Sequence, residues 1–388
     1  MSLKICFLSF THVFYDTRIL YKECRSLAEA GFKVVHIAPD RDPNHNHLTH
    51  GVQIELYPQR NGILGRLIKF IDLYRRAIHL DADCYHCNEI ESWIVGLLIK
   101  LFHRDKRIIF DVHEHYPSRF DEPHIPKGLG LIGKPIVHLL FRVLPRWTDY
   151  IIFAKRSVVS DFRGIEGKHN FIFNYGPLWL NSRLSEDVTP IIRQELGKSK
   201  VAIHIGGFAR ARGWPQLLKS LTMMEYRHLE IFCFGQVHEG EDELMAEARR
   251  LGVAHRIHLK QPIPYEQMFD YLLCADIGLM LYQPGIQNHI FAFPMKMYDY
   301  MLAGLPFIGP DFAIEVEPVV REEKCGLLVN TGDAAKIAKA LDWLCENPDL
   351  ANEMGKRGRQ AIIDRYNWET EAKKLIEIYT NFNTADTG

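Results

Sequence analysis

The sequence predicts an α/β protein built from two tandem Rossmann-like, doubly wound domains. With 388 residues the chain is longer than one hydrophobic core usually accommodates, and it fits two domains of common size. Short β-branched or aromatic runs alternate with helical stretches, which is the pattern of a parallel sheet with helices on both faces. The alternation stops near Asn174 and starts again at Lys200, so the fold repeats. Two such domains in tandem would place their ligand sites facing each other across a cleft.

The first half holds the elements of one such domain. The predicted strands cover residues 4–10, 33–39, 52–58, 83–87, 107–112 and 149–154. One predicted helix ends at residue 30, and three others cover residues 65–80, 91–102 and 131–144. We expect residues 1–175 to form the first domain.

A segment rich in Pro, Gly, Asn and Ser then predicts a linker over residues 176–199. The second alternation has predicted strands at 200–207, 229–235, 256–261, 275–281, 305–310 and 326–329. We expect residues 200–365 to form the second domain, and residues 366–388 to form a helix that crosses back to the first domain.

The composition is that of a globular protein, with 47% hydrophobic and 24% charged residues. The N-terminal sequence MSLKICFLSF runs into a strand without the features of a signal peptide, so we expect a cytoplasmic protein. Lys134, His138 and Arg142 interrupt the longest apolar stretch, so we expect no transmembrane helix. Cys84 and Cys87 form a C-x-x-C pair within a strand, where they point to opposite faces, so we expect reduced thiols there and no zinc or redox site.

The charge is distributed unevenly along the chain. Residues 1–180 contain 24 Lys and Arg against 19 Asp and Glu, and the remainder contains 23 against 29, in agreement with the net charge of −1. The positive charge lies in two apolar and basic segments, 60–80 and 127–147. Such helices either lie on an anionic membrane surface or pack against the core with solvated basic side chains, and both interpretations stay open here. The overall charge and the motifs do not fit a nucleic-acid-binding protein.

Polar residues follow the first strand where a ligand site is expected. His12, Asp16 and Arg18 lie in a loop that leads into a helix. Asp16 is a good helix N-cap, and a simple surface turn is the alternative. The carboxyl edge of an α/β sheet is where such proteins bind ligands, which favours a functional role.

Two further strands of the first half end in polar residues, within the sequences HCNEIES and DVHEHYP. Because the carboxyl ends of parallel strands meet at one edge of the sheet, these residues should join the first loop in a polar acceptor site. The candidates are His86, Asn88, Glu89, Asp111, His113 and Glu114.

In the second half, the sequence IHIGGFARARGW predicts a phosphate site. Gly206 and Gly207 follow a strand and allow close approach of the backbone to a diphosphate. Arg212 and the helix that begins near Gly213 would neutralise its charge. This is not the G-x-G-x-x-G pattern of nicotinamide-dependent enzymes.

The most informative segment is FPMKMYDYMLAGLPFIG. It predicts a helix that begins near Pro294 and ends at Gly304 in a C-cap. Lys296 in the first turn can face an anion, and Asp299 one turn later can accept hydrogen bonds from ribose hydroxyls.

Together with DTRILYKECRSLAEAGFKV, DCYHCNEIES, FDVHEHYP and GGFARARG, this segment resembles retaining glycosyltransferase family four, which has the two-domain glycosyltransferase B architecture. The resemblance covers almost the whole chain, and it implies that residues 1–175 form an acceptor-binding domain and residues 200–365 a nucleotide-sugar-binding domain. It implies that Arg212 contacts the donor diphosphate, that Asp299 binds the nucleotide ribose and that His113 lies near the transferred sugar.

Three departures from the family pattern concern the donor site. Asp299 stands where the family usually has glutamate, and Phe291 stands where a second glutamate usually precedes it by eight residues. Gly207 replaces a common arginine, which leaves more of the phosphate charge to Arg212.

The resemblance implies transfer of a sugar from a nucleotide diphosphate, by family default uridine diphosphate, to a glycan or lipid-linked acceptor with retention of configuration. We expect no metal cofactor, because Asp81 and Asp83 precede their strand at the wrong edge of the sheet for a catalytic Asp-x-Asp pair. Bacterial-type surface polysaccharide or glycoconjugate synthesis and peripheral attachment to the inner face of a membrane fit these expectations. The alternatives are a non-hydrolysing nucleotide-sugar epimerase and an inactive nucleotide-binding relative.

Overall fold

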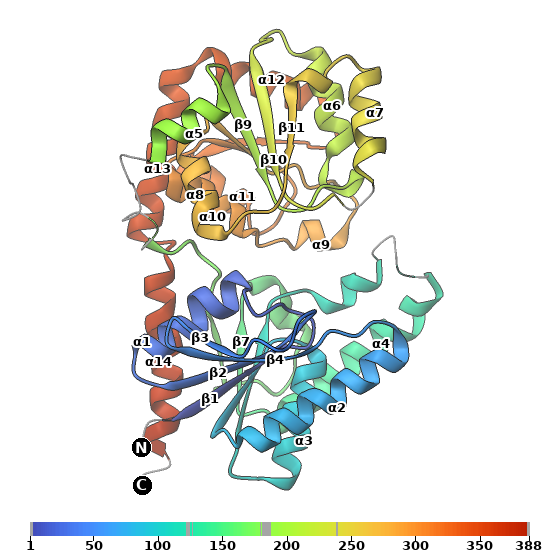
Figure 1. The fold of residues 1–388 in the computed structure, drawn as a ribbon, viewed down its shortest axis with the longest axis vertical. Coiled ribbons are helices and arrows are strands. Elements are labelled where there is room, and N and C mark those ends of the chain that lie inside the picture. The colour runs from blue at the N-terminus through green and yellow to red at the C-terminus, as the bar shows by residue number, and fades with distance from the viewer. Residues whose placement is uncertain are drawn as a thin grey trace. The chain divides into compact units, whose positions relative to one another are not determined.

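The computed structural model describes residues 3–121, 125, 127–178, 180, 188–237 and 240–385. The chain forms two compact units (Figure 1). Unit 1 comprises Met1–Asn174 and Trp368–Gly388, and unit 2 comprises Tyr175–Asn367. Each unit contains its own sheet and its own hydrophobic core.

Unit 1 has an eight-stranded sheet in the order β3-β4-β2-β1-β5-β6-β7-β8. Its strands are β1 (Lys4–Leu8), β2 (Lys33–Asp40), β3 (His47–Thr49), β4 (Val52–Pro58), β5 (Cys84–Cys87), β6 (Arg107–Val112), β7 (Tyr150–Phe153) and β8 (His169–Phe171). All pairings are parallel except that of β3 with β4. The strand order reverses between β1 and β5, so the carboxyl ends of these strands flank a crevice where α/β proteins bind ligands.

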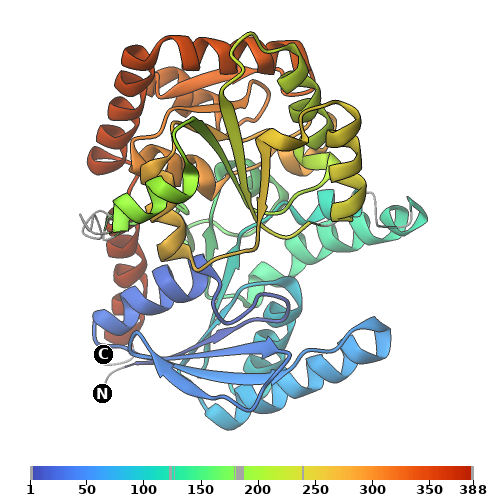
Figure 2. The ribbon, with the colours of Figure 1, turned by 45° about the horizontal axis from the view of Figure 1, so that its top comes forward.

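Helices cover both faces of this sheet, as the alternating pattern predicts. One face packs against α2 (Gly62–Leu80), α3 (Ile90–Phe102) and α4 (Lys127–Val143), and Figure 2 shows α2 lying along it. The other face packs against the π-helical η1 (Thr17–Cys24), α1 (Arg25–Glu29) and the C-terminal α14 (Trp368–Ala385). Short 3₁₀ turns complete the unit: η2 (Tyr116–Asp121), η3 (Leu144–Trp147) and η4 (Arg156–Asp161).

Cys84 and Cys87 confirm the alternation along β5. Cys87 packs among the residues beneath α2 to α4, whereas Cys84 packs on the side of α14. Burial raises the pKa of both thiols well above their usual value. The two residues are therefore buried, free cysteines that pack in opposite cores.

Unit 2 has a six-stranded parallel sheet in the order β11-β10-β9-β12-β13-β14. Its strands are β9 (Lys200–Ile205), β10 (Leu229–Phe234), β11 (Ile257–Lys260), β12 (Ile277–Leu279), β13 (Phe307–Pro310) and β14 (Gly326–Val329). The order reverses between β9 and β12, which places a second ligand crevice at the carboxyl ends of those strands.

Helices also cover both faces of the second sheet. One core includes residues of α5 (Val188–Leu196), α8 (Tyr265–Cys274), α10 (Met295–Ala303), α11 (Glu317–Glu323) and α13 (Pro348–Asp364). The other includes residues of α6 (Trp214–Met223), α7 (Glu241–Arg250) and α12 (Ala334–Glu346). The turns η6 (Arg210–Arg212) and η7 (Ala254–Arg256) and the short α9 (Gln287–Ile290) connect these elements. The repeated alternation thus gives two Rossmann-like domains, as the sequence predicts.

The segment expected as a linker, residues 176–199, belongs to unit 2 and contains α5. Ile192 and Leu196 of this helix are buried in the core of unit 2, so part of the segment packs as a helix. The many turn-forming residues around it led to the prediction of a linker. Residues 179 and 181–187 of this segment lie outside the described residues. The crossing-back segment begins at Trp368, whose indole donates to Ser26 Oγ at 2.9 Å.

One apolar segment differs from the sequence expectation. By length and composition alone, the segment Gly128–Trp147 could cross a membrane, with a mean hydropathy of 1.3, although four basic or histidine side chains interrupt it. Only 17% of its most apolar window is buried. Val137 and Phe141 nevertheless lie in the core beneath the sheet. The helix therefore packs through one side and leaves an apolar side exposed.

Candidate functional site

In unit 1, the loop after β1 is held in place by Glu89. The carboxylate of this residue accepts hydrogen bonds from the backbone N–H groups of Phe10, Thr11 and His12, at 2.8 to 2.9 Å. Glu89 also caps α3 through a reciprocal pair of hydrogen bonds with Ser92. The charge of His12 and three donated hydrogen bonds keep the pKa of this buried carboxyl below its usual value, despite the opposing effect of burial. Glu89 thereby fixes the loop that carries His12.

His12 and Asp16 form an ion pair within this loop, with Nδ1 of His12 3.1 Å from Oδ2 of Asp16. Burial alone would lower the pKa of His12, but the hydrogen bond to Asp16 and the charge of Glu89 raise it to about 9. At neutral pH His12 is therefore an imidazolium. Asp16 also caps η1 by accepting from the backbone N–H groups of Arg18 and Ile19. Asp16 therefore caps a helix and also lies at the carboxyl edge of the sheet.

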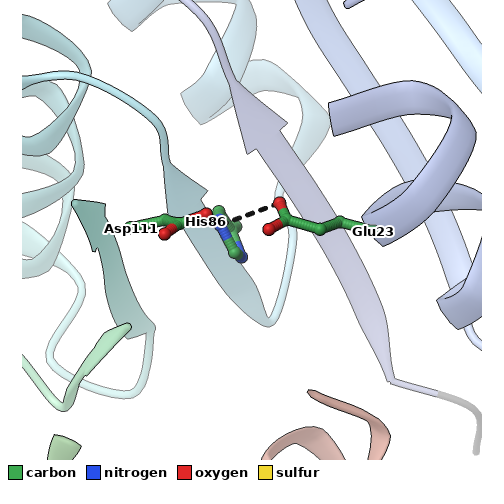
Figure 3. A group of neighbouring side chains, drawn as sticks. All are labelled: Glu23, His86 and Asp111. Atoms are coloured by element: carbon green, nitrogen blue, oxygen red, sulfur yellow. Dashed lines mark ion pairs between the residues drawn. The ribbon is translucent and has the colours of Figure 1, made fainter. Parts of the chain in front are cut away.

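Beneath the loop lies a buried group of charged side chains, part of which Figure 3 shows. Arg18 donates two hydrogen bonds from its Nη2 to the two carboxylate oxygens of Asp111, at 3.0 and 3.1 Å. The same guanidinium lies 2.9 Å from the carboxylate of Glu23. Burial raises the pKa of Glu23 well above its usual value, whereas for Asp111 the effect of Arg18 outweighs burial and lowers the pKa. Arg18 thus pairs mainly with an ionised Asp111.

Asp111 in turn holds His113. Its Oδ2 lies 2.6 Å from Nε2 of His113, and because a carboxylate only accepts, Nε2 carries the proton. His86 lies on the other side of Asp111, at 3.5 Å, and its Nδ1 lies 2.6 Å from the hydroxyl of Tyr379 in α14. The rings of His12 and His113 meet edge to face with centroids 5.6 Å apart. Two imidazoles therefore stand together at the carboxyl edge of the sheet.

Glu23, His86 and Asp111 could hold a metal ion, since one ligand atom of each lies within 4.8 Å of the others. Arg18 already brings a positive charge to within 3.0 Å of both carboxylates. A divalent cation at this point would be repelled by the guanidinium. We therefore interpret the group as a structural ion network and keep the prediction of a metal-free enzyme.

Burial divides the predicted acceptor residues into two groups. His86 and Asn88 are fully buried, Arg18 and Glu89 are at most 4% exposed, and the side chain of each bonds other groups of unit 1. They support the residues above them. His12, Asp16, His113 and Glu114 remain as the exposed or half-buried candidates at the sheet edge.

In unit 2, glycines at and around the turn after β9 meet backbone conformations or contacts that favour glycine. Gly206 has a φ of +99°, and a Cβ on the neighbouring Gly235 would lie 2.1 Å from the carbonyl oxygen of Gly206. Gly213, with a φ of +83°, precedes α6 and would clash with the carbonyl oxygen of Leu281 at 2.5 Å if it had a Cβ. The backbone can therefore approach a ligand closely at this turn.

Two basic side chains converge on Tyr282, which follows β12. The guanidinium carbon of Arg212 lies 4.9 Å from the ring centroid of Tyr282, and Nζ of Lys296 lies 5.7 Å from it. A Cβ on Gly206 would lie 3.7 Å from Nζ of Lys296, so the ammonium group adjoins the glycine turn. Among the described residues, neither cation forms an ion pair with a carboxylate, whereas Arg210 of the same turn pairs with Glu243. Two basic groups thus lie beside the glycine turn, where the sequence predicts a phosphate site.

The titration of neighbouring groups reflects the same positive charge. Burial and the charge of Arg212 lower the pKa of Lys296 to about 7. Burial, followed by the charge of Arg212, lowers the pKa of His289, which stacks on Tyr282, to about 4. For His204, burial and the charges of Lys296 and Arg212 lower the pKa. A bound anion would relieve this repulsion.

Asp299 lies in α10, one turn after Lys296, and is 2% exposed. Its carboxylate accepts a hydrogen bond from the hydroxyl of Tyr265 at 2.6 Å. The helix begins after Pro294 and ends at Gly304 in a left-handed C-cap, as the sequence predicts. Tyr265 therefore holds Asp299 in a fixed orientation next to the cationic pair.

Sequence reasoning did not identify Tyr282 and Tyr265. Tyr282 follows the strand beside β9 at the point of strand reversal, and this position in the sequence ADIGLMLYQPG could have identified it. Tyr265 has no such signal, because its partner Asp299 is 34 residues away. Tyr379 is similarly linked to His86 only by the fold.

Two family models match this chain. The model described as Glycosyltransferase Family 4 matches residues 17–169, and the model described as Glycosyl transferases group 1 matches residues 188–361. The first match contains His113 and the network around Asp111, and the second contains Arg212, Lys296 and Asp299. The chain belongs to glycosyltransferase family four. The matches cover both units of this glycosyltransferase, so the resemblance found in the motifs is confirmed.

Curated relatives carry related names at low identity. A D-inositol 3-phosphate glycosyltransferase from Corynebacterium urealyticum is 26% identical over 52% of this chain and 48% of its own length. The chain thus matches about half of that relative. The putative glycosyltransferase EpsD from Bacillus subtilis is 20% identical over 85% of this chain and 83% of its own length.

Solved structures confirm the glycosyltransferase B fold. Sucrose-phosphate synthase from Thermosynechococcus elongatus has a TM-score of 0.78 at 17% identity and covers 99% of this chain and 100% of its own. Anabaena HepE in complex with UDP-glucose has a TM-score of 0.72 at 16% identity and covers 98% and 100%. At these identities the likeness shows the fold alone.

Proposed function

We propose that this glycosyltransferase moves a sugar from a nucleotide diphosphate to an acceptor, with the diphosphate bound by unit 2. The observation that carries the proposal is the pair formed by Arg212 and Lys296 over Tyr282, at the strand reversal and next to the Gly206 turn. Two basic groups that pair with no carboxylate among the described residues suit an anionic ligand such as a diphosphate.

The donor proposed is a uridine diphosphate sugar. Supporting it, the similar structure of Anabaena HepE is a complex with UDP-glucose, and the family default is the same nucleotide. In the proposal Asp299, oriented by Tyr265, accepts hydrogen bonds from the ribose hydroxyls. Phe291 stands where a glutamate would contact the sugar, so backbone amides or other side chains must bind the sugar hydroxyls.

The proposed chemistry needs no metal ion. Cleavage of the anomeric C–O bond leaves negative charge on the departing diphosphate, and fixed positive groups stabilise such charge as it develops. Arg212 and Lys296 supply these groups. We propose front-face attack by the acceptor with retention of configuration, assisted by the leaving phosphate.

Unit 1 is proposed to bind the acceptor through His12, Asp16, His113 and Glu114. His113 is held through Nε2 by Asp111, which leaves Nδ1 for the transferred sugar or the acceptor. The imidazolium of His12 would stabilise negative charge beside it. A glycan or lipid-linked acceptor fits this proposal.

A peripheral contact with a membrane is part of the same proposal. The helices α2 and α4 expose large apolar side chains that their basic neighbours flank, namely Ile63, Leu64, Leu67, Leu131, Ile132 and Leu139. Such faces bind at the surface of an anionic bilayer. Surface polysaccharide or glycoconjugate synthesis would supply acceptors there.

The test is to incubate the protein with a panel of nucleotide diphosphate sugars, with and without glycan or lipid-linked acceptors, and to measure release of the nucleoside diphosphate. The proposal expects release that depends on an acceptor and a first-formed product with the anomeric configuration of the donor, read by NMR. A new nucleotide sugar formed from donor alone would indicate an epimerase. Nucleotide binding without turnover across the panel would indicate an inactive relative.

A further inference from the structure

Unit 1 has an apolar groove that none of the candidate residues for sugar transfer lines. Its volume is about 580 Å³, and α3 and η3 form it. The lining is aliphatic and aromatic except for two basic side chains: Ile94, Leu97, Leu98, Lys100, Leu101, Arg104, Leu144 and Trp147. The volume is within the range of roughly 300–1,000 Å³ for small-molecule sites.

The groove lies at the amino edge of the sheet. The end of α3 at Phe102 precedes β6, and η3 precedes β7. The candidate residues for sugar transfer, by contrast, follow the carboxyl ends of β1, β5 and β6. A ligand in the groove would therefore not compete with donor or acceptor.

Large apolar side chains stand exposed at its mouth. Among the lining residues, Leu101 is 65% exposed and Trp147 is 56% exposed. Phe102, which follows Leu101 in the sequence, is 70% exposed. An exposed tryptophan beside aliphatic side chains is typical of the boundary between water and hydrocarbon, where its ring is apolar and its N–H stays hydrated. The groove thus opens into a surface suited to a hydrocarbon chain.

The rim of the groove is basic. The two segments that form it, residues 100–107 and 142–149, contain six Lys and Arg against two Asp. Lys100 and Arg107 pair with Asp149, and Lys106 pairs with Asp81 and Asp105. Among the described residues Arg104, which lines the groove, pairs with no carboxylate, and neither does Arg146. The unpaired Arg104 beside an apolar groove complements an anionic head attached to an apolar tail.

This charge also distinguishes between occupants. In a two-fold pair of this chain each groove would face the same basic rim of its partner, and like charges would repel. We propose that the groove takes an acyl chain of an anionic phospholipid, with the lipid phosphate at Arg104. The site would hold the enzyme at a bilayer independently of the transferase reaction.

The experiment uses the full chain and vesicles of phosphatidylcholine, either alone or mixed with phosphatidylglycerol. The variants Leu101→Asp and Arg104→Glu should each weaken binding to the mixed vesicles at least tenfold. Leu48→Asp is the matched control, because Leu48 is an exposed leucine of the same unit, 74% exposed and outside the groove. Its binding should equal that of the unchanged protein.

A second readout shows where the lipid acyl chain binds. Phosphatidylglycerol with brominated acyl chains should quench part of the tryptophan fluorescence, and Trp147→Phe should remove that part. Thermal unfolding and binding of uridine diphosphate, measured for every variant, show that the fold and unit 2 are intact. Failure of nucleotide binding by unit 2 would appear only in the nucleotide measurement, whereas failure of the membrane contact proposed for α4 would appear as unchanged vesicle binding in Ile132→Asp.

Several outcomes would overturn the groove proposal. One is unchanged vesicle binding in both groove variants, and another is equal binding to vesicles with and without phosphatidylglycerol. Loss of binding in Ile132→Asp, with retention in Leu101→Asp, would assign the membrane contact to α4 alone. A dimer in solution that Leu101→Asp dissociates would assign the groove to a second copy of the chain.

Discussion

Replacing Arg212 by alanine should weaken the binding of uridine diphosphate by about 10- to 100-fold. Arg212 is one of two cations that converge on Tyr282, and neither pairs with a carboxylate among the described residues. Hydrogen bonds to charged groups contribute about 1.5–3 kcal/mol each, and about 1.4 kcal/mol corresponds to a factor of ten in affinity. The loss of one such contact gives the expected range, and turnover should fall by a similar factor.

The matched control is Arg210→Ala. Arg210 lies in the same turn, but its guanidinium pairs with Glu243 at 2.9 Å and is about half exposed. Its removal should leave nucleotide affinity within about twofold, because surface ion pairs contribute little. Isothermal titration calorimetry on the full chain measures both variants, and thermal unfolding shows that both are folded.

Binding of uridine diphosphate by Arg212→Ala as tight as that of the unchanged protein would refute this role of Arg212. Equal losses in Arg210→Ala and Arg212→Ala would also contradict it, because the effect would then be one of overall charge. A loss confined to Arg212→Ala identifies the guanidinium over Tyr282 as the diphosphate ligand.

Three further predictions concern protonation and catalysis. Because the pKa of Lys296 is lowered to about 7, diphosphate binding at pH 8 should take up protons, and calorimetry in buffers of different ionisation enthalpy that shows no uptake would contradict this. His113→Ala should lower turnover at least tenfold and leave nucleotide affinity unchanged, which kinetics and calorimetry measure together; an equal loss in both would assign His113 to donor binding. Because the pKa of His12 is raised to about 9, its ion pair with Asp16 should stabilise the fold fully below pH 6.5. This contribution to stability should be lost as the pH rises through 9. Thermal unfolding should therefore show the difference between the unchanged protein and His12→Ala shrinking over that interval, and a constant difference would disprove the ion pair with Asp16.

Strand and helix positions could be predicted from the sequence because their patterns are local. The strand at residues 107–112 and the helix ending at Gly304 agree with the structure at their boundaries. The edge strand β3, by contrast, has three residues, and two of them are exposed, so no hydrophobic pattern marks it. The helix α5 was not predicted, because turn-forming residues surround its two buried apolar positions.

The candidate site could be predicted only as a set of strand ends. Sequence spacing places His86 and Glu89 at the right edge, but it does not show which side chains are buried beneath that edge. Glu89 turns back to bind the backbone of the loop after β1, 77 to 79 residues away. His86 turns toward Tyr379, 293 residues away. These directions depend on tertiary packing, which a single sequence does not show.

The expectation of a cytoplasmic protein stays a prediction, as do the donor sugar, the acceptor and the retention of configuration. Each depends on a measurement of activity or location. The binding of the diphosphate by unit 2 comes first among them, because every step proposed for sugar transfer assumes it.

A crystal grown with uridine diphosphate tests that binding most directly. We predict density for the diphosphate in contact with Arg212 and Lys296, and for the ribose next to Asp299. Density for the nucleotide anywhere else on the protein, with Arg212 and Lys296 free of phosphate, would contradict this binding mode.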